Sequence, residues 1–354
     1  MGNRTYALPD RAAAEHAAPG GVVSGWSRRR AGRALGGLAV LGALGLLAVV
    51  GGWGEGWFGG RAESAVSTLR LEDIPFDGAA AYEHLQAICR IGPRPSGSPG
   101  MAKQQQLLAE HFRKLGGHVE LQRFRVRHPL DGSPVAMANL IVRWHPERRE
   151  RILLGTHYDN IPFPNQDPHN PRGTFIGAND GASSVAVLMQ LGHDMSKLGG
   201  PLGVDFVFFD GEEFVYSDPD RYFLGSEYFA RQYANDVRRD FHYRWGVVLD
   251  MVGDKDLQIF QERNSAWWDD TRPLVEHIWK LADRLGVREF IARKKYEISD
   301  DHVPLHDIGK ISCVVVIDYD YPYWHTEADT PDKCSALSLA KVGWVIQQWL
   351  REAK

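Results

Sequence analysis

The chain has only three cysteines in 354 residues, Cys89, Cys313 and Cys334. A disulfide framework is excluded, because at most one pair can form. Cys313 lies in the apolar run 311–317, which predicts a buried core residue. No cysteine stands in a sequence context that favours a reactive thiolate, so the sequence gives no support for a cysteine nucleophile.

The chain also lacks an excess of positive charge. It has 41 Lys and Arg against 45 Asp and Glu, a formal net charge of −4. Nucleic-acid binding requires a basic surface, and the arginine clusters at 28–30 and 148–149 are only local. We therefore expect no nucleic-acid partner. No internal repeat is evident, and 44% hydrophobic residues fit one large domain with an ample core.

Long hydrophobic runs are scarce, and the run 34–53 stands out because it carries no charge. Twenty helical residues reach about 30 Å, the thickness of a bilayer's hydrocarbon core. Arginines at 28–30 and 33 precede the run and favour a cytoplasmic N-terminus. We expect an uncleaved transmembrane signal-anchor, with the rest of the chain on the extracytoplasmic side. A cleaved signal peptide followed by secretion is the alternative.

The run divides the chain into a disordered basic cytoplasmic tail (1–33), the anchor (34–53), a linker (54–71) and a folded domain (72–354). In the domain, apolar strand-like runs alternate with helical patterns. Helices are expected at 82–89, 103–115, 183–198, 225–233, 271–285 and 336–351, and strands at 138–144, 151–154, 204–209, 245–250 and 311–317. Apolar strands between helices predict the α/β class, as a single three-layer α/β/α domain with a mostly parallel mixed central sheet.

An acidic turn follows one of these strands. The hexapeptide FFDGEE at 208–213 closes an apolar run with two adjacent carboxylates, Glu212 and Glu213. Adjacent residues at the end of a strand point in different directions. One carboxylate can therefore bind a metal while the other faces a substrate as a general base. Ligands of open α/β sheets bind at the carboxyl ends of strands, where this turn is expected.

Four further motifs place His or Asp at strand ends or in glycine-rich turns: GTHYD at 155–159, GAND at 177–180, LD at 249–250 and WHT at 324–326. With the acidic turn they supply a mixed nitrogen and oxygen ligand set of the kind that zinc accepts. The candidate ligands are His157, Asp180, Glu213, Asp250 and His325. None of the motifs contains cysteine, which argues against a structural thiolate zinc. Glu212 is left over as the candidate general base.

Ordinary explanations exist for single members of this set. Asp180 can cap the helix that follows it, and His325 beside Trp324 can be a packed histidine. Asp159 can orient His157 instead of binding the metal. These explanations fail together, because five separate strand-end positions supply one coherent ligand set. We therefore expect a metal site.

The order of these motifs resembles the M28 zinc exopeptidase clan, and within it the glutaminyl-peptide cyclotransferases (glutaminyl cyclases). The resemblance spans about residues 72 to 352. It is carried by the segments 95–100, 157–159, 208–213, 224–226, 300–304 and 324–326. The segment DDHVP at 300–304 discriminates best, because aminopeptidases of the clan share the ligands but usually not this segment.

The resemblance implies a catalytic Zn²⁺ held by Asp180, Glu213 and His325, with Glu212 as the proton shuttle. The implied reaction converts N-terminal glutamine of peptides or proteins into pyroglutamate and releases ammonia. A zinc aminopeptidase of the M28 type is the alternative, and there Glu212 would activate water. A non-catalytic binding domain is a third reading, which the complete ligand set disfavours. The sequence does not indicate an oligomeric state.

The resemblance also implies that Asp250 and Asp300 form a hydrogen-bonded carboxyl pair. Two carboxyls at that distance share a proton, and a protonated Asp250 would be a poor ligand. One zinc ion is then expected. An aminopeptidase would instead hold two, with His157 and Asp250 completing a second site bridged by Asp180. Asp300 can alternatively cap the turn before Val303.

Trp324 is implied as a wall of the substrate pocket. The chain departs from animal cyclases at Val314, where they have histidine, and at Asp320, where they have phenylalanine. It also lacks their tryptophan after the Glu-Glu pair and their cysteine pair near the first histidine motif. These departures concern pocket shape more than metal chemistry. Tyr321 and Tyr323 are either replacement aromatic walls or strand packing.

Overall fold

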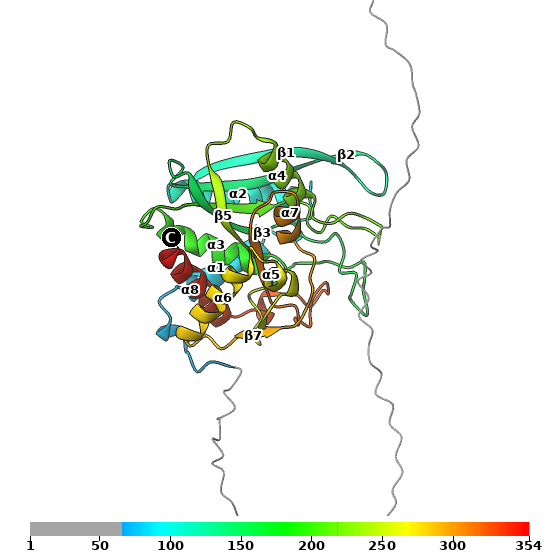
Figure 1. The fold of residues 1–354 in the computed structure, drawn as a ribbon. Helices are drawn as coiled ribbons and strands as arrows, with labels where there is room; N and C mark the ends of the chain where they lie inside the picture. Colours follow the sequence, from blue (N-terminus) through cyan, green and yellow to red (C-terminus); the bar gives the residue numbers. More distant parts are fainter. Residues whose placement is uncertain (1–65, 218, 354) are drawn as a thin grey trace, which may run out of the picture. The chain divides into compact units, whose positions relative to one another are not determined.

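The structure is a computed structural model that describes residues 66–217 and 219–353. A six-stranded sheet with the order β1-β2-β4-β3-β5-β8 forms its centre (Figure 1). The strands are β1 (His118–Arg127), β2 (Pro134–Trp144), β3 (Glu150–His157), β4 (Gly203–Phe209), β5 (His242–Asp250) and β8 (Cys313–Ile317). The neighbours β4, β3, β5 and β8 pair in parallel, whereas β1–β2 and β2–β4 are antiparallel. The predicted mixed α/β sheet, mostly parallel, is confirmed.

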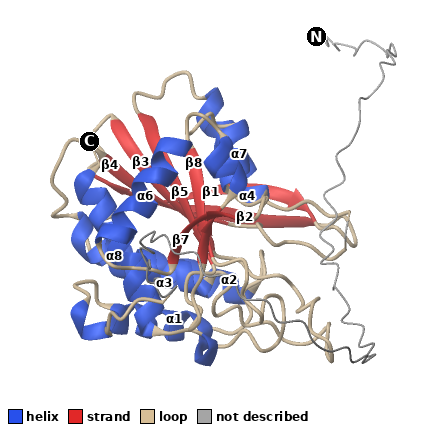
Figure 2. Cartoon of the chain, turned by 60° about the horizontal axis from the view of Figure 1, so that its bottom comes forward, coloured by secondary structure: helices blue, strands red, loops and turns tan. Residues whose placement is uncertain are grey.

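Helices cover both faces of this sheet (Figure 2). One face packs against α1 (Gly78–Cys89), α2 (Pro99–Lys114), α3 (Ala182–Met195), α6 (Arg272–Arg284) and α8 (Ala336–Glu352). The other face packs against α4 (Leu224–Asn235) and α7 (His302–Asp307). Strand β4 shows why both faces are apolar: Phe206 and Phe208 enter the first core, and Val207 and Phe209 enter the second.

Helix starts differ from the expected ones because capping residues extend the helices. Asp77 accepts a hydrogen bond from the amide of Ala80, so α1 begins at Gly78. Ser98 caps α2 in the same way, and Pro99 occupies its first position, where a missing amide hydrogen costs nothing. The expected starts at 82 and 103 were therefore too late.

Several elements were not expected from the sequence. The edge strand β1 alternates polar and apolar residues and is largely solvent-exposed, so it has no apolar run. Four short elements between β5 and β8 were also unexpected: α5 (Arg263–Trp267), α7, β6 (Ile259–Gln261) and β7 (Phe290–Lys294). The two strands form a separate small sheet.

All three cysteines lie in the described part of the chain, and all are buried and unpaired. Cys313 belongs to β8 and to the core, as predicted. Burial raises the pKa of Cys89 to about 12, which keeps this thiol protonated and inert.

None of the helices in residues 66–217 and 219–353 is long and apolar enough to cross a membrane. The predicted tail (1–33) and anchor (34–53) lie outside the described residues, as does the linker up to residue 65. Ordered contacts begin before the expected domain start at 72, because the amide and hydroxyl of Ser67 both donate to Glu289 at 3.0 Å.

Candidate metal centre

The predicted ligands meet at the carboxyl edge of the parallel strands. His157 is the last residue of β3 and Asp250 the last of β5, and these strands pair directly. Strand β4 ends at Phe209 and leads into the turn that carries Glu212 and Glu213. Parallel strands end on the same side of a sheet, so three distant stretches of sequence deliver their side chains to one place.

Asp180, Glu213 and His325 form the first ligand set, and all three are buried. The Nε2 atom of His325 lies 2.5 Å from Oε1 of Glu213 and 3.5 Å from Oδ2 of Asp180. Oδ2 of Asp180 is buried without a hydrogen-bond partner among the described residues. An unpartnered buried carboxylate oxygen is costly, and a bound cation would satisfy it.

The helix-cap interpretation of Asp180 is wrong. Gly181, not Asp180, is the N-cap of α3, and within the described chain no side-chain hydrogen bond caps this helix. Asp180 instead points one carboxylate oxygen at each of two histidines, since its Oδ1 lies 3.2 Å from Nε2 of His157. The packed-histidine interpretation of His325 is also too limited, because its ring contacts two carboxylates.

His157, Asp180 and Asp250 form a second set that shares Asp180 with the first. Nε2 of His157 lies 3.1 Å from Oδ1 of Asp250. All five predicted ligands are therefore brought together, with Asp180 between the two sets. The two sets could hold two ions, or the His157 ring could bridge Asp180 and Asp250 by hydrogen bonds beside one ion.

Asp159 holds the acidic turn in place. Its carboxylate accepts hydrogen bonds from the amides of Glu212 at 3.1 Å and Glu213 at 3.2 Å, and from the hydroxyl of Ser96 at 3.2 Å. Its nearest approach to Nδ1 of His157 is 4.0 Å, too far for a hydrogen bond. Asp159 therefore does not hydrogen-bond His157, which was the alternative role considered for it, because its carboxylate accepts hydrogen bonds from the turn.

Asp329 is a residue that sequence reasoning missed. Its carboxylate accepts hydrogen bonds from the amides of Asn179 at 2.8 Å and Asp180 at 3.1 Å, and from the Tyr321 hydroxyl at 2.6 Å. It follows His325 by four residues, so proximity to the WHT motif was the available signal. Tyr321 is buried, and its hydroxyl donates to Asp329. It is therefore part of the packed interior and not a wall of the substrate pocket.

The long loop after β3 contacts the last ligand. Oδ1 of Asn165 lies 3.0 Å from Nδ1 of His325, and the amide of Gln166 donates to the His325 carbonyl at 3.0 Å. A ligating histidine is commonly oriented by a partner on its second ring nitrogen. Asn165 fills that position, which leaves Nε2 of His325 facing Asp180 and Glu213.

Glu212 belongs to a third group of possible ligands, with His157 and Glu213, and it retains access to solvent, with 14% of its side chain exposed. One of its oxygens is 3.8 Å from Nδ1 of His157. Burial, opposed by His157 and reinforced by the carboxyl groups of Glu213, Asp301 and Asp300, raises the pKa of Glu212 well above its ordinary value. A raised carboxyl pKa suits a group that must take up and release a proton.

Asp300 is buried near Asp250, and their predicted hydrogen-bonded carboxyl pair stays a prediction. Oδ1 of Asp300 accepts from the amide of Asp301 at 2.5 Å, and its Oδ2 has no hydrogen-bond partner in the described chain. Burial, with a further contribution from the charge of Asp250, raises the pKa of Asp300 to about 6. The two carboxyls therefore interact through their charges.

The predicted pocket residues lie next to this centre. Trp324 is half-buried and stacks on the ring of His325, with centroids 3.8 Å apart. Tyr323 is half-buried and packs edge-on against Tyr321 at 5.6 Å. Of the departures from animal cyclases, Val314 is fully buried in β8.

Asp320 accepts a hydrogen bond from the Lys295 ammonium at 2.5 Å and another from the Tyr296 hydroxyl. The charge that replaces an aromatic ring at this position is therefore paired.

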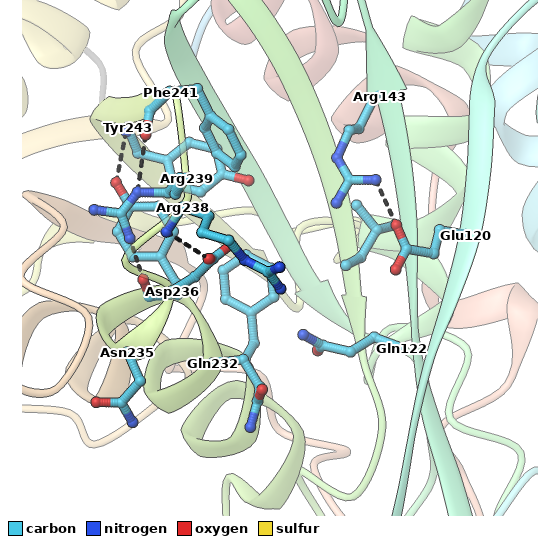
Figure 3. Close-up of a pocket in the computed structure, with 13 residues that line it drawn as sticks. Glu120, Gln122, Arg143, Gln232, Asn235, Asp236, Arg238, Arg239, Phe241 and Tyr243 are labelled. Atoms are coloured by element: carbon cyan, nitrogen blue, oxygen red, sulfur yellow. Dashed lines mark hydrogen bonds and ion pairs between the residues drawn. The ribbon is translucent and has the colours of Figure 1, made fainter.

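A separate cavity of about 430 Å³ lies between β1, β2 and α4 and the segment that follows it (Figure 3). The guanidinium of Arg143 pairs with Glu120 at 2.5 Å, and that of Arg239 lies 3.7 Å from the centroid of the Tyr233 ring. No predicted ligand, base or pocket residue lines this cavity. The chemistry expected from the sequence belongs to the strand ends instead.

Comparison with known proteins agrees with this geometry. The model of peptidase family M28 matches residues 139–350. Bovine glutaminyl-peptide cyclotransferase is 25% identical over 289 residues, which are 73% of this chain and 78% of that protein. The solved glutaminyl cyclase of Fimbriiglobus ruber is 37% identical, with a TM-score of 0.76, covering 79% of this chain and 96% of that one. A leucine aminopeptidase precursor of Bacteroides thetaiotaomicron is 27% identical, with a TM-score of 0.73 over 79% and 98%.

Proposed function

The chain belongs to peptidase family M28, and from that premise we propose that it is a glutaminyl-peptide cyclotransferase. It converts an N-terminal glutamine of a peptide or protein into pyroglutamate and releases ammonia. The observation that carries this assignment is the 37% identity to a solved glutaminyl cyclase over 96% of that chain, with the acid–histidine centre complete. The aminopeptidase neighbours fit the alternative only as relatives in the same family.

Zinc fits the residues present. Asp180, Glu213 and His325 offer two oxygens and one nitrogen, a set that zinc binds while leaving a position for substrate. The family and its zinc-dependent neighbours also support zinc. We assign these three side chains as the ligands of one ion. His157 and Asp250 would then stay hydrogen-bonded to each other, and not form a second site.

Bound zinc would polarise the side-chain amide of the substrate glutamine as a Lewis acid. Side chains of the protein carry out the proton transfers. Glu212 accepts a proton from the substrate's α-amine and delivers it to the departing ammonia. Asp250 and Asp300 form a charge-coupled pair that is positioned to relay a proton at the same edge of the sheet.

Substrate orientation is the remaining requirement, because the attack is intramolecular. The amine must fold back onto the side-chain carbon of the same glutamine, which is an orientation effect. Trp324 stacks on His325, and Tyr323 is half-buried two residues before it; we assign both as aromatic walls that hold this folded conformation. The loop through Asn165 contacts the other nitrogen of the His325 ring.

Two matched peptides test the reaction. With a Gln-initiated peptide the purified protein should release one ammonia per peptide and leave the peptide's length unchanged. With a Leu-initiated peptide of the same remaining sequence it should do nothing. Mass spectrometry and an ammonia assay follow both products. Loss of the first residue from the Leu-initiated peptide would instead establish the aminopeptidase.

We also propose that the run 34–53 anchors the protein in a membrane, with the catalytic domain on the extracytoplasmic side. The support is the length and apolar character of the run and the arginines before it. Deletion of residues 1–60 should move the protein from the membrane to the soluble fraction and leave turnover within about twofold, because general acid–base and ligand residues all lie beyond residue 156. Full-length protein recovered in the soluble fraction, with a mature N-terminus beyond residue 50, would favour a cleaved signal.

A further inference from the structure

Three histidines from three helices meet away from the strand ends. His84 belongs to α1, His111 to α2 and His193 to α3. The ring centroids are 4.9 Å apart for His84 and His111, 5.5 Å for His111 and His193, and 6.2 Å for His84 and His193. Since a helix rises about 1.5 Å per residue, His193 lies roughly 17 Å along α3 from its start beside Asp180. The cluster is therefore distinct from the proposed zinc centre.

The ring nitrogens of this cluster converge. One nitrogen of each ring lies within 4.8 Å of one nitrogen of each of the others. Zinc–nitrogen bonds of about 2.0–2.1 Å place tetrahedral ligand nitrogens roughly 3.4 Å apart. Closing the remaining gap takes small side-chain rotations, and His193 has room for them because it is exposed. Its exposure also gives an ion and a coordinating water access to the cluster.

One ring nitrogen of His111 is fixed by a backbone carbonyl. Its Nε2 lies 2.9 Å from the carbonyl oxygen of Met189. A carbonyl only accepts hydrogen bonds, so the neutral ring carries its proton on Nε2 and its lone pair on Nδ1. Ligating histidines typically donate their second N–H to a carbonyl or carboxylate in this way.

The cluster also favours the neutral form that a metal requires. Burial, with further contributions from His111 and His193, lowers the pKa of His84 to about 4. Burial also lowers the pKa of His111, although its bond to Met189 opposes the shift. At neutral pH these two rings therefore offer lone pairs with no proton to displace.

We propose that His84, His111 and His193 form a second metal site, which binds a divalent first-row ion such as Zn²⁺ or Cu²⁺ with water completing its coordination. Three imidazoles are a donor set that suits these ions. The helices α1, α2 and α3 cover one face of the sheet, and the bound ion crosslinks them. Simple packing of the three rings is the competing explanation.

Cu²⁺ tests the site, because its electron paramagnetic resonance spectrum reports the number of coordinated nitrogens. The full-length protein is prepared without a polyhistidine tag, loaded with its catalytic zinc and dialysed against Cu²⁺. We compare the wild type with His193→Gln, which changes an exposed side chain. The control is His242→Gln, which removes a histidine on β5 that is 58% exposed and lies outside the cluster.

We expect the wild type and the control each to bind one additional Cu²⁺ per chain compared with His193→Gln. The spectrum of this additional ion should show three coordinated nitrogens. His193→Gln should bind Cu²⁺ at least tenfold more weakly at this site. Cu²⁺ should raise the melting temperature of the wild type and the control but not of His193→Gln, since binding to the folded state alone stabilises it. Turnover on the Gln-initiated peptide should be equal in all three, which verifies folding. Equal copper stoichiometry and affinity in all three proteins would overturn the proposal.

Discussion

Glu212→Gln should lower turnover of a Gln-initiated peptide by about 10²- to 10⁴-fold, the usual contribution of a general acid–base group. Glutamine keeps the size of the side chain but cannot accept the amine's proton. Zinc content should stay at the wild-type level, because the proposed ligand atoms belong to Asp180, Glu213 and His325. Ammonia release gives the rate, and elemental analysis of the same sample gives the zinc.

Glu276→Gln is the matched control, since this glutamate is exposed on α6, outside the centre. It should leave both turnover and zinc unchanged. A zinc-loaded Glu212→Gln protein with nearly wild-type turnover would rule out the role proposed for Glu212. Loss of zinc together with turnover would show instead that Glu212 supports the ligands.

Asp300→Asn is the second substitution with a large expected effect. The Asp300 carboxyl is buried, and its pKa of about 6 lies close to neutral pH, so it can both hold and release a proton. Asparagine can do neither, and kcat should fall by about 10²- to 10⁴-fold with little change in KM. Zinc should remain bound, because Asp300 is in neither ligand set.

A purely structural role for Asp300 would give a different result. A loosened pocket raises KM and lowers the melting temperature, whereas loss of a proton relay lowers kcat and changes the pH profile of the reaction. Asp307→Asn, an exposed residue at the end of α7, serves as the control. Unchanged kcat in a zinc-loaded Asp300→Asn protein would contradict the relay.

The five candidate ligands could be predicted from the sequence because each is marked by its local surroundings. His157 and Asp250 end apolar strands, and Glu213 follows one closely. Strand ends in a parallel sheet meet at one edge, so recognising the strands was enough to bring these three ligands together, whereas Asp180 and His325 lie in loops beyond the strands. The core strands were recognised by their apolar stretches: β3 contains Ile152, Leu153 and Leu154, and β4 is apolar except for Asp205.

The residues that support the ligands could not be predicted in this way. Asp159 has the same local signature as a ligand. Only the fold shows that its carboxylate accepts hydrogen bonds from two backbone amides of the acidic turn. Asp329 carries no strand signal, and the two amides that it binds, those of Asn179 and Asp180, lie about 150 residues earlier in the chain. Likewise, nothing local states how far Asp300 lies from Asp250. Such contacts depend on tertiary distances rather than on sequence pattern.

The contacts of Asp329 have a consequence for the entropy of metal binding. One carboxylate joins the segment that holds Asp180 to Tyr321, four residues before His325. Two ligands from distant parts of the chain are therefore fixed relative to each other before an ion arrives. A preorganised site loses less conformational freedom on binding, so more of the interaction energy remains as affinity. The Tyr321 hydroxyl, which touches none of the proposed ligands through the hydrogen bonds described, thereby contributes to how tightly the centre can hold its ion.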